Sequence, residues 1–138
     1  MKLSRNQQHF IIMTVIYNEL NDFENSKSED HRSASFLMSE LCECPFEDVP
    51  LYIKDSVGHA LSKYGQIKEA FLPKLNTWKW ERLPLLTRSI LIMSYAHYYF
   101  VEKVDKKVVI NIALNLAKKY IDEKQAKFIN AILDGVLK

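Results

Sequence analysis

Glycine, proline and cysteine are scarce in this chain, which holds three, four and two of them in 138 residues. Collagen-like, low-complexity and loop-rich disulfide architectures need many residues with special backbone geometry, so this composition excludes them. The glycines are isolated, at Gly58, Gly65 and Gly135, and form no phosphate-binding loop or dinucleotide fingerprint. The remainder, 48% hydrophobic and 26% charged residues, is typical of a helical globular protein, and we expect one domain over residues 1–138.

Residue clusters that carry catalysis or bind metals are also missing. Cys42 and Cys44, with His31 upstream, have metal-like spacing, but a single Cys-x-Cys lacks the second pair that a structural zinc site needs. We interpret the two cysteines as reduced residues beside a helix end. No nucleophile with a base and no paired carboxylates in an apolar setting are visible, so we predict no enzyme, no cofactor and no metal. The histidines in helical stretches are interpreted as surface or satisfied core residues: His9, His59 and His97.

No uninterrupted apolar run is long enough for a membrane span. The longest apolar stretch, residues 83–101, contains Arg88 and His97, and charged groups at membrane depth are costly. We therefore expect a buried helix here and no membrane contact. The amino terminus lacks the apolar core and small-residue cleavage site of a secretion signal, so we expect a cytoplasmic protein.

Charge is unevenly distributed along the chain, although the formal net charge is only +2. Residues 19–56 hold ten acidic residues against three basic ones, whereas residues 57–138 hold fourteen basic residues against seven acidic ones. Such separation favours an anionic partner, typically a nucleic acid, at the basic part of the surface. The alternative is that the lysines are only the solvated faces of amphipathic helices.

Apolar residues recur at helical spacing, and strand-like alternation is absent. Ser4 followed by Gln7 is a capping-box pattern and predicts a first helix up to about Asn21. The polar residues 21–32 indicate a linker or loop. Residues 33–41 are a short helix candidate before the Cys-Glu-Cys-Pro break.

The middle of the chain predicts two shorter helices. An apolar stripe that begins at Ile53 indicates a helix ending near Tyr64, with Gly65 in the left-handed position that terminates it. Residues 67–72 form a further apolar piece, which Pro73 stops.

The last three helices have the most regular patterns. Pro84 suits the first turn of a central core helix, Asp105 caps the next helix, and Asp122 with Gln125 forms a second capping box. Asn111 and Asn130 are predicted to bond backbone groups between helices. The predicted core is Ile90, Leu91, Val109, Ile112, Ala113, Leu116, Ile129, Ile132 and Leu133.

Trp78 and Trp80 lie in the connection before the central helix. They could stack on nucleic-acid bases. Because tryptophans that flank a buried helix are more often core anchors, we interpret both as buried.

Three segments follow one another in the carboxy-terminal half: TWKWERLPLLTRSIL, VVINIALNLAKKY and KFINAILDGVLK. In this order and at these separations, they resemble the motifs of the NusB family of bacterial transcription antitermination factors. The resemblance covers residues 78–138 and extends to the first helix. The residues that match or approximate the motifs are Trp78, Trp80, Arg82, Leu83, Arg88, Ile90, Leu91, Ile110, Asn111, Leu116, Ala117, Lys118, Lys127, Phe128, Asn130, Leu133 and Asp134.

This resemblance implies an all-α fold of about six or seven helices in two small packed bundles. It also implies a divergent antitermination factor that binds single-stranded boxA-type RNA of ribosomal RNA leaders. The expected protein partner is a small-subunit ribosomal protein, NusE, with which it joins the transcription elongation complex. Monomer and homodimer both remain open.

The chain departs from the family pattern at several positions. The arginine-rich start of the family corresponds here to residues 5–9, which include one certain cation. Ile112 and His97 stand where the family has glutamates, and Ala131 stands where it has glycine. A NusB-fold interaction module that has lost RNA binding is therefore the alternative function.

If RNA binds, we expect its surface to combine the start of the first helix with the junction of the last two. Phe128 is more often a core residue in such a position, but the family match allows a base to stack on it. The candidate RNA-binding residues are Arg5, Gln7, His9, Lys118, Lys119, Lys124, Lys127 and Phe128.

Overall fold

The computed structural model describes residues 2–25 and 33–138, which contain helices and no strand. The expected all-α fold with about six or seven helices is confirmed, since the described residues form seven α-helices. The α-helices are α1 (Arg5–Glu24), α2 (Ala34–Cys42), α3 (Leu51–Ser62), α4 (Tyr64–Phe71), α5 (Leu85–Ala96), α6 (Lys106–Tyr120) and α7 (Glu123–Val136).

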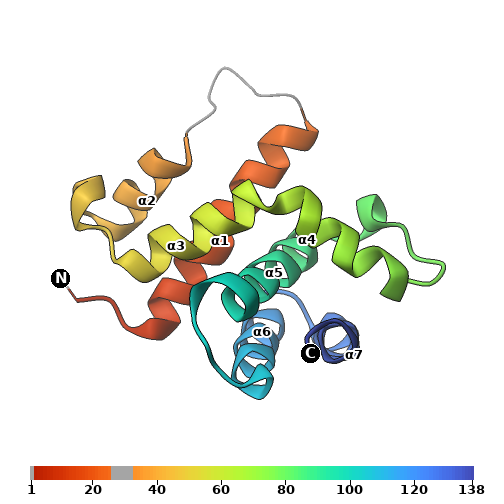
Figure 1. Ribbon diagram of the computed structural model, residues 1–138. Coiled ribbons are helices and arrows are strands. Elements are labelled where there is room, and N and C mark those ends of the chain that lie inside the picture. Colours follow the sequence, from red (N-terminus) through yellow and green to blue (C-terminus); the bar gives the residue numbers. More distant parts are fainter. Residues whose placement is uncertain (1, 26–32) are drawn as a thin grey trace.

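Helix α5 is the centre of the packing, as its apolar sequence predicts. Residues 87–94 are all buried, and the helix contacts α1, α3 and α4 as well as α6 and α7. In Figure 1, α5 lies between α1 and α3 on one side and the blue α6–α7 pair on the other. This arrangement brings the start of α1 next to α6, far along the sequence.

The capping box at the start of α1 is confirmed. Gln7 N donates to Ser4 Oγ at 3.1 Å, and Ser4 N donates to Gln7 Oε1 at 2.8 Å. The helix ends at Glu24, three residues beyond the predicted end at Asn21. An interhelix ion pair explains the difference, because the buried Arg88 of α5 binds the Glu24 carboxylate through both terminal nitrogens, with Nη2 to Oε1 at 3.2 Å.

The second capping box is only half formed. Gln125 N donates to Asp122 Oδ1 at 2.7 Å, as predicted. The Gln125 side chain does not return to the Asp122 backbone, because its Oε1 accepts a hydrogen bond from Thr87 Oγ1 at 2.8 Å. Thr87 is fully buried on α5, so its hydroxyl needs a protein acceptor, and Gln125 supplies it.

The prediction for Gly65 is wrong. Gly65 is the second residue of α4, and none of the glycines in the described ranges has a positive φ. The chain passes from α3 to α4 through Lys63 alone, with φ −104° and ψ 15°, so no left-handed residue is required. Positive φ values occur instead at Glu43, which ends α2, and at Asn76.

Eight of the nine predicted core residues are buried, whereas Ile112 is half-buried. Ile112 packs against the core and also lines a hollow between α1 and α6. Trp80 is buried, and its Nε1 donates to Tyr64 Oη at 3.0 Å, so it is the predicted core anchor. The prediction for Trp78 is wrong, because 60% of this residue is exposed.

The prediction for Asn111 and Asn130 is also wrong. Both residues are exposed, and neither side chain has a hydrogen-bond partner within the described ranges. They lie on the outward faces of α6 and α7, where an amide can be satisfied by water.

Candidate nucleic-acid interface

The start of α1 holds three of the candidate residues, and the structure gives each a different environment. Arg5 is 55% exposed at its side chain, but its Nη1 donates to Glu102 Oε1 at 2.6 Å. Its guanidinium carbon also lies 3.7 Å from the centre of the Tyr52 ring. The one certain cation of this stretch is therefore already paired, while Gln7 is exposed and its Oε1 closes the helix cap.

His9 is buried rather than exposed, with 7% of the residue accessible. Its Nε2 lies 3.1 Å from Tyr52 Oη, which in turn lies 3.4 Å from His97 Nδ1. Burial, together with the nearby His97, lowers the pKa of His9 to about 4, so the ring is neutral at pH 7. Burial also lowers the pKa of His97 and raises the pKa of Tyr52 to about 12.

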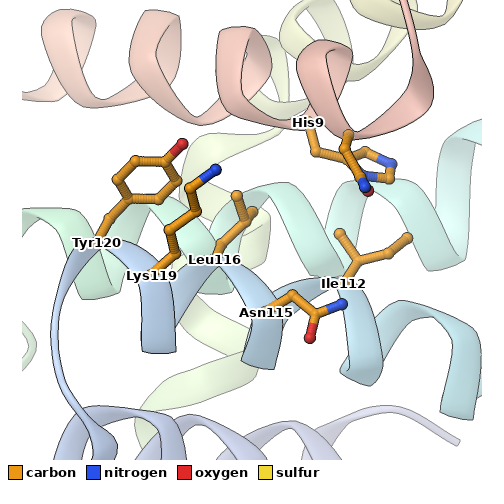
Figure 2. Close-up of a pocket in the computed structure, with 7 residues that line it drawn as sticks. His9, Ile112, Asn115, Leu116, Lys119 and Tyr120 are labelled. Atoms are coloured by element: carbon orange, nitrogen blue, oxygen red, sulfur yellow. The ribbon is translucent and has the colours of Figure 1, made fainter.

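A hollow of about 190 Å³ separates the first turns of α1 from the last turns of α6. Figure 2 shows His9 of α1 facing a row of α6 side chains across this space. Helical spacing places the α6 residues on one face, since they are three and four positions apart. The lining residues are Asn6, His9, Ile112, Asn115, Leu116, Lys119 and Tyr120.

An aromatic pair joins this hollow to a wider groove. The rings of Phe10 and Tyr120 have centroids 5.2 Å apart, and both residues are more than one third exposed. Beyond them runs a groove of about 450 Å³ with a mainly apolar lining, between α1 and the start of α5. It is lined by Phe10, Met13, Thr14, Tyr17, Pro84, Leu85, Leu86 and Tyr120.

The start of α7 forms the other end of this surface. Phe128 is half-buried, and the exposed Trp78 packs edge-on against it at 6.3 Å between ring centroids. Both rings border a small hollow of about 110 Å³ together with Arg82 and Lys124. An exposed Trp78 ring beside a half-buried Phe128, with two cations at the same hollow, suits stacking on an unpaired base beside its phosphate.

These hollows form a continuous surface, which we call the furrow. The α1–α6 hollow shares Tyr120 with the apolar groove, and the groove shares Pro84 with the hollow beside Phe128. The structure thus brings the start of α1 and the junction of α6 and α7 onto one surface, and RNA binding there stays a prediction. Lys118 and Lys127 are exposed nearby on α6 and α7 but do not line these hollows.

Several residues of the furrow were missed by the sequence analysis. Asn115 gave no signal beyond its position three residues after Ile112 and four before Lys119. Tyr120 was not among the candidate residues, and Trp78 was assigned to the core. Only the packing of α1 and α5 against α6 and α7 reveals that these residues share one surface.

The described ranges hold neither a metal-binding cluster nor a membrane-spanning helix. No group of three or more His, Cys, Asp or Glu residues there could hold a metal ion. Cys42 is buried at the end of α2 and Cys44 is half-buried, both as free thiols, while His31 lies outside the described residues. No helix within residues 2–25 and 33–138 has the length and hydropathy to cross a membrane.

Comparison with known proteins places the chain in a family. The family model described as NusB matches residues 6–138. A transcription antitermination protein NusB from Macrococcus caseolyticus is 34% identical over 98 residues, which cover 71% of this chain and 73% of the relative. Another from Clostridium botulinum strain Loch Maree is 29% identical over 141 residues, which cover 98% and 100%.

A solved structure of NusB from T. maritima has the same fold. Its TM-score is 0.76 at 21% sequence identity, over 99% of this chain and 92% of that one. Together with the match to the family model, these similarities show that the chain belongs to the NusB family, whose fold is all-α.

Proposed function

We propose that this protein is a transcription antitermination factor that binds boxA-type single-stranded RNA along the furrow, together with a small-subunit ribosomal protein. The whole chain acts as one domain, and its role is binding rather than catalysis. In this proposal the pair joins the transcription elongation complex. The curated relatives carry the name of a transcription antitermination protein, which supports the proposal.

The observation that carries the proposal is the combination along the furrow of cations that form no ion pair within the described ranges and rings that are at least partly exposed. Lys119 lies at one end and Lys124 at the other, and neither has an ion-pair partner among residues 2–25 and 33–138. Phe128 and Trp78 offer rings to bases beside Lys124. Stacking requires unpaired bases, so the chemistry suits a single strand rather than a duplex.

The apolar groove in the middle of the furrow suits the protein partner. Its lining is mainly apolar, and it lies between the two basic ends. A protein bound there would contact the same RNA strand, which would explain why the two proteins act as a pair. The candidate RNA residues would then flank the protein interface on both sides.

The alternative, an interaction module without RNA binding, is favoured by one observation. Arg5 is already bound to Glu102 and Tyr52, so the stretch that is rich in arginine in the family offers RNA little free charge here. The two functions differ in one measurable property, which is salt-dependent affinity for RNA.

A titration of the full chain with a boxA-like single strand tests the proposal. Binding is measured by fluorescence anisotropy at two or more salt concentrations, with and without the ribosomal protein. We expect affinity to fall as salt rises, because each phosphate contact releases counterions. No binding under any of these conditions would leave the interaction module as the function.

The double variant Lys124→Glu with Lys127→Glu localises the interface. Each lost phosphate contact on a single strand changes the log-log salt slope by about 0.7, so the slope should flatten by about one to two. Lys103→Glu with Lys107→Glu is the matched control, since it changes the net charge equally at exposed lysines by the start of α6. Unchanged affinity in the first variant, with the helical circular dichroism spectrum retained, would contradict the assigned interface.

A further inference from the structure

The hollow between α1 and α6 contains uncharged polar side chains, which have no part in the proposed phosphate contacts. Asn6 and His9 come from α1, and Asn115 comes from α6. Behind them, Ile112 and Leu116 form an apolar floor, visible in Figure 2 between His9 and Lys119. Amides around an apolar floor suit a flat heterocycle, whose faces are apolar and whose edge is polar.

The two asparagine side chains are available for a ligand. Both residues are exposed, and neither amide has a hydrogen-bond partner in the part of the chain that the structure describes. Each amide presents one acceptor oxygen and two N–H donors. Because they come from opposite sides of the hollow, they can bind two positions on the edge of one base.

His9 adds a neutral and fixed hydrogen-bonding group. Its Nε2 is held by Tyr52 Oη at 3.1 Å, which orients the ring, and Nδ1 is left without a protein partner among the described residues. An uncharged ring in this place selects for hydrogen-bond geometry rather than for phosphate. In this respect the hollow differs from the hollow beside Phe128, which is lined by two rings and two cations but by no asparagine or histidine.

The size of the hollow limits what can occupy it. Its volume of about 190 Å³ is below the roughly 300 Å³ at which drug-sized ligand sites begin, so it has room for one base and not two. Lys119 stands at the rim, four residues after Asn115 on the same face of α6. A base in the hollow would therefore place its phosphate near an ammonium group.

We propose that the hollow between α1 and α6 accepts one unpaired base of the bound RNA, with Asn6, His9 and Asn115 reading its edge and Lys119 binding its phosphate. This inference rests on the proposed RNA-binding function and deepens it. The preference for a particular RNA sequence then arises in this hollow, from its two amides and its neutral histidine. Lys124 and Phe128 supply affinity for a single strand of any sequence.

Abasic scanning of the RNA tests the inference. Each nucleotide of the boxA-like strand is replaced in turn by an abasic one, and binding to the full-length protein is measured. We expect one position at which the loss of the base weakens binding about tenfold, which is the effect of one to two hydrogen bonds. In the variant Asn115→Leu, removing the base at that position should weaken binding no more than removing a base elsewhere in the strand. The salt dependence of the affinity should stay unchanged, because the substitution removes no charge.

Asn6→Leu is the second variant and should act at the same position from the other helix. Asn111→Leu is the matched control, because Asn111 is an exposed asparagine of α6 that does not line the hollow. Leucine favours helices, so all three variants are expected to fold, and circular dichroism checks this.

The outcomes separate this inference from the function on which it rests. If the wild type does not bind RNA, the proposed function fails, and the base site fails with it. If the wild type binds RNA but both hollow variants keep the full abasic profile, the base site is wrong and the function stands. If Asn115→Leu weakens the binding of the ribosomal protein but not the binding of RNA, the hollow is part of the interface with that protein. This outcome overturns the inference.

Discussion

The buried histidine beside the furrow makes stability depend on pH, and His9→Gln measures the effect. Burial lowers the pKa of His9 from 6.5 to about 4. The unfolded chain therefore takes up a proton as the pH falls through about 6.5, whereas the folded protein does so only near pH 4. The free energy of unfolding is thus fully retained above pH 6.5 and decreases as the pH falls towards 4.

The size of this effect follows from the two pKa values. The difference between 6.5 and about 4 corresponds to about 3 kcal/mol when the titration is complete. Between pH 7 and pH 5, linkage gives a loss of about 2 kcal/mol from His9 alone. The lowered pKa of His97 adds a loss of the same sign, so the wild type should lose more than this.

Urea unfolding followed by circular dichroism at pH 7 and pH 5 provides the measurement. In His9→Gln the drop in unfolding free energy between the two pH values should be smaller by about 2 kcal/mol. Carboxylates that titrate in this range act in both proteins and cancel in the comparison. An equal drop in wild type and variant, with equal m-values, would refute the assignment of the pH effect to His9.

Two further predictions concern the core. Leu116→Ala should lower the unfolding free energy by about 2 to 5 kcal/mol, because the Leu116 side chain of α6 is buried. A loss below about 0.5 kcal/mol in urea titrations would contradict that burial. Glu24→Ala should cost about 1 to 3 kcal/mol, because it leaves the buried Arg88 guanidinium without its carboxylate. Thermal or urea unfolding checks this, and a neutral result would mean that water replaces Glu24 fully.

The parts of the fold that depend on local hydrogen bonds could be predicted from the sequence. The caps at Ser4 and Asp105 are examples, since Lys107 N donates to Asp105 Oδ1 at 3.0 Å as the pattern predicts. Two of the departures arise where a side chain has a partner far along the chain. Glu24 extends α1 because Arg88 binds it, 64 residues away. Gln125 leaves its capping role for Thr87, 38 residues away.

The positions of the candidate residues could be predicted only in part. Lys119 lies in the last turn of α6 and Lys124 in the first turn of α7, so their positions at neighbouring helix ends follow from the sequence pattern. Burial of His9 and exposure of Trp78 could not be predicted, because each depends on which helix covers that face. The role of Asn115 was likewise hidden, since it exists only where α1 faces α6.

The Arg5–Glu102 contact has a consequence for how this end of the protein meets an anion. Glu102 binds Arg5 at Nη1 at 2.6 Å, while 55% of the Arg5 side chain stays exposed. A guanidinium has five N–H donors, so a phosphate can bind Arg5 beside Glu102 as well as in its place. The two opposite charges of the pair largely cancel at a distance, so Arg5 adds less to the long-range attraction of an anion than a lone arginine would.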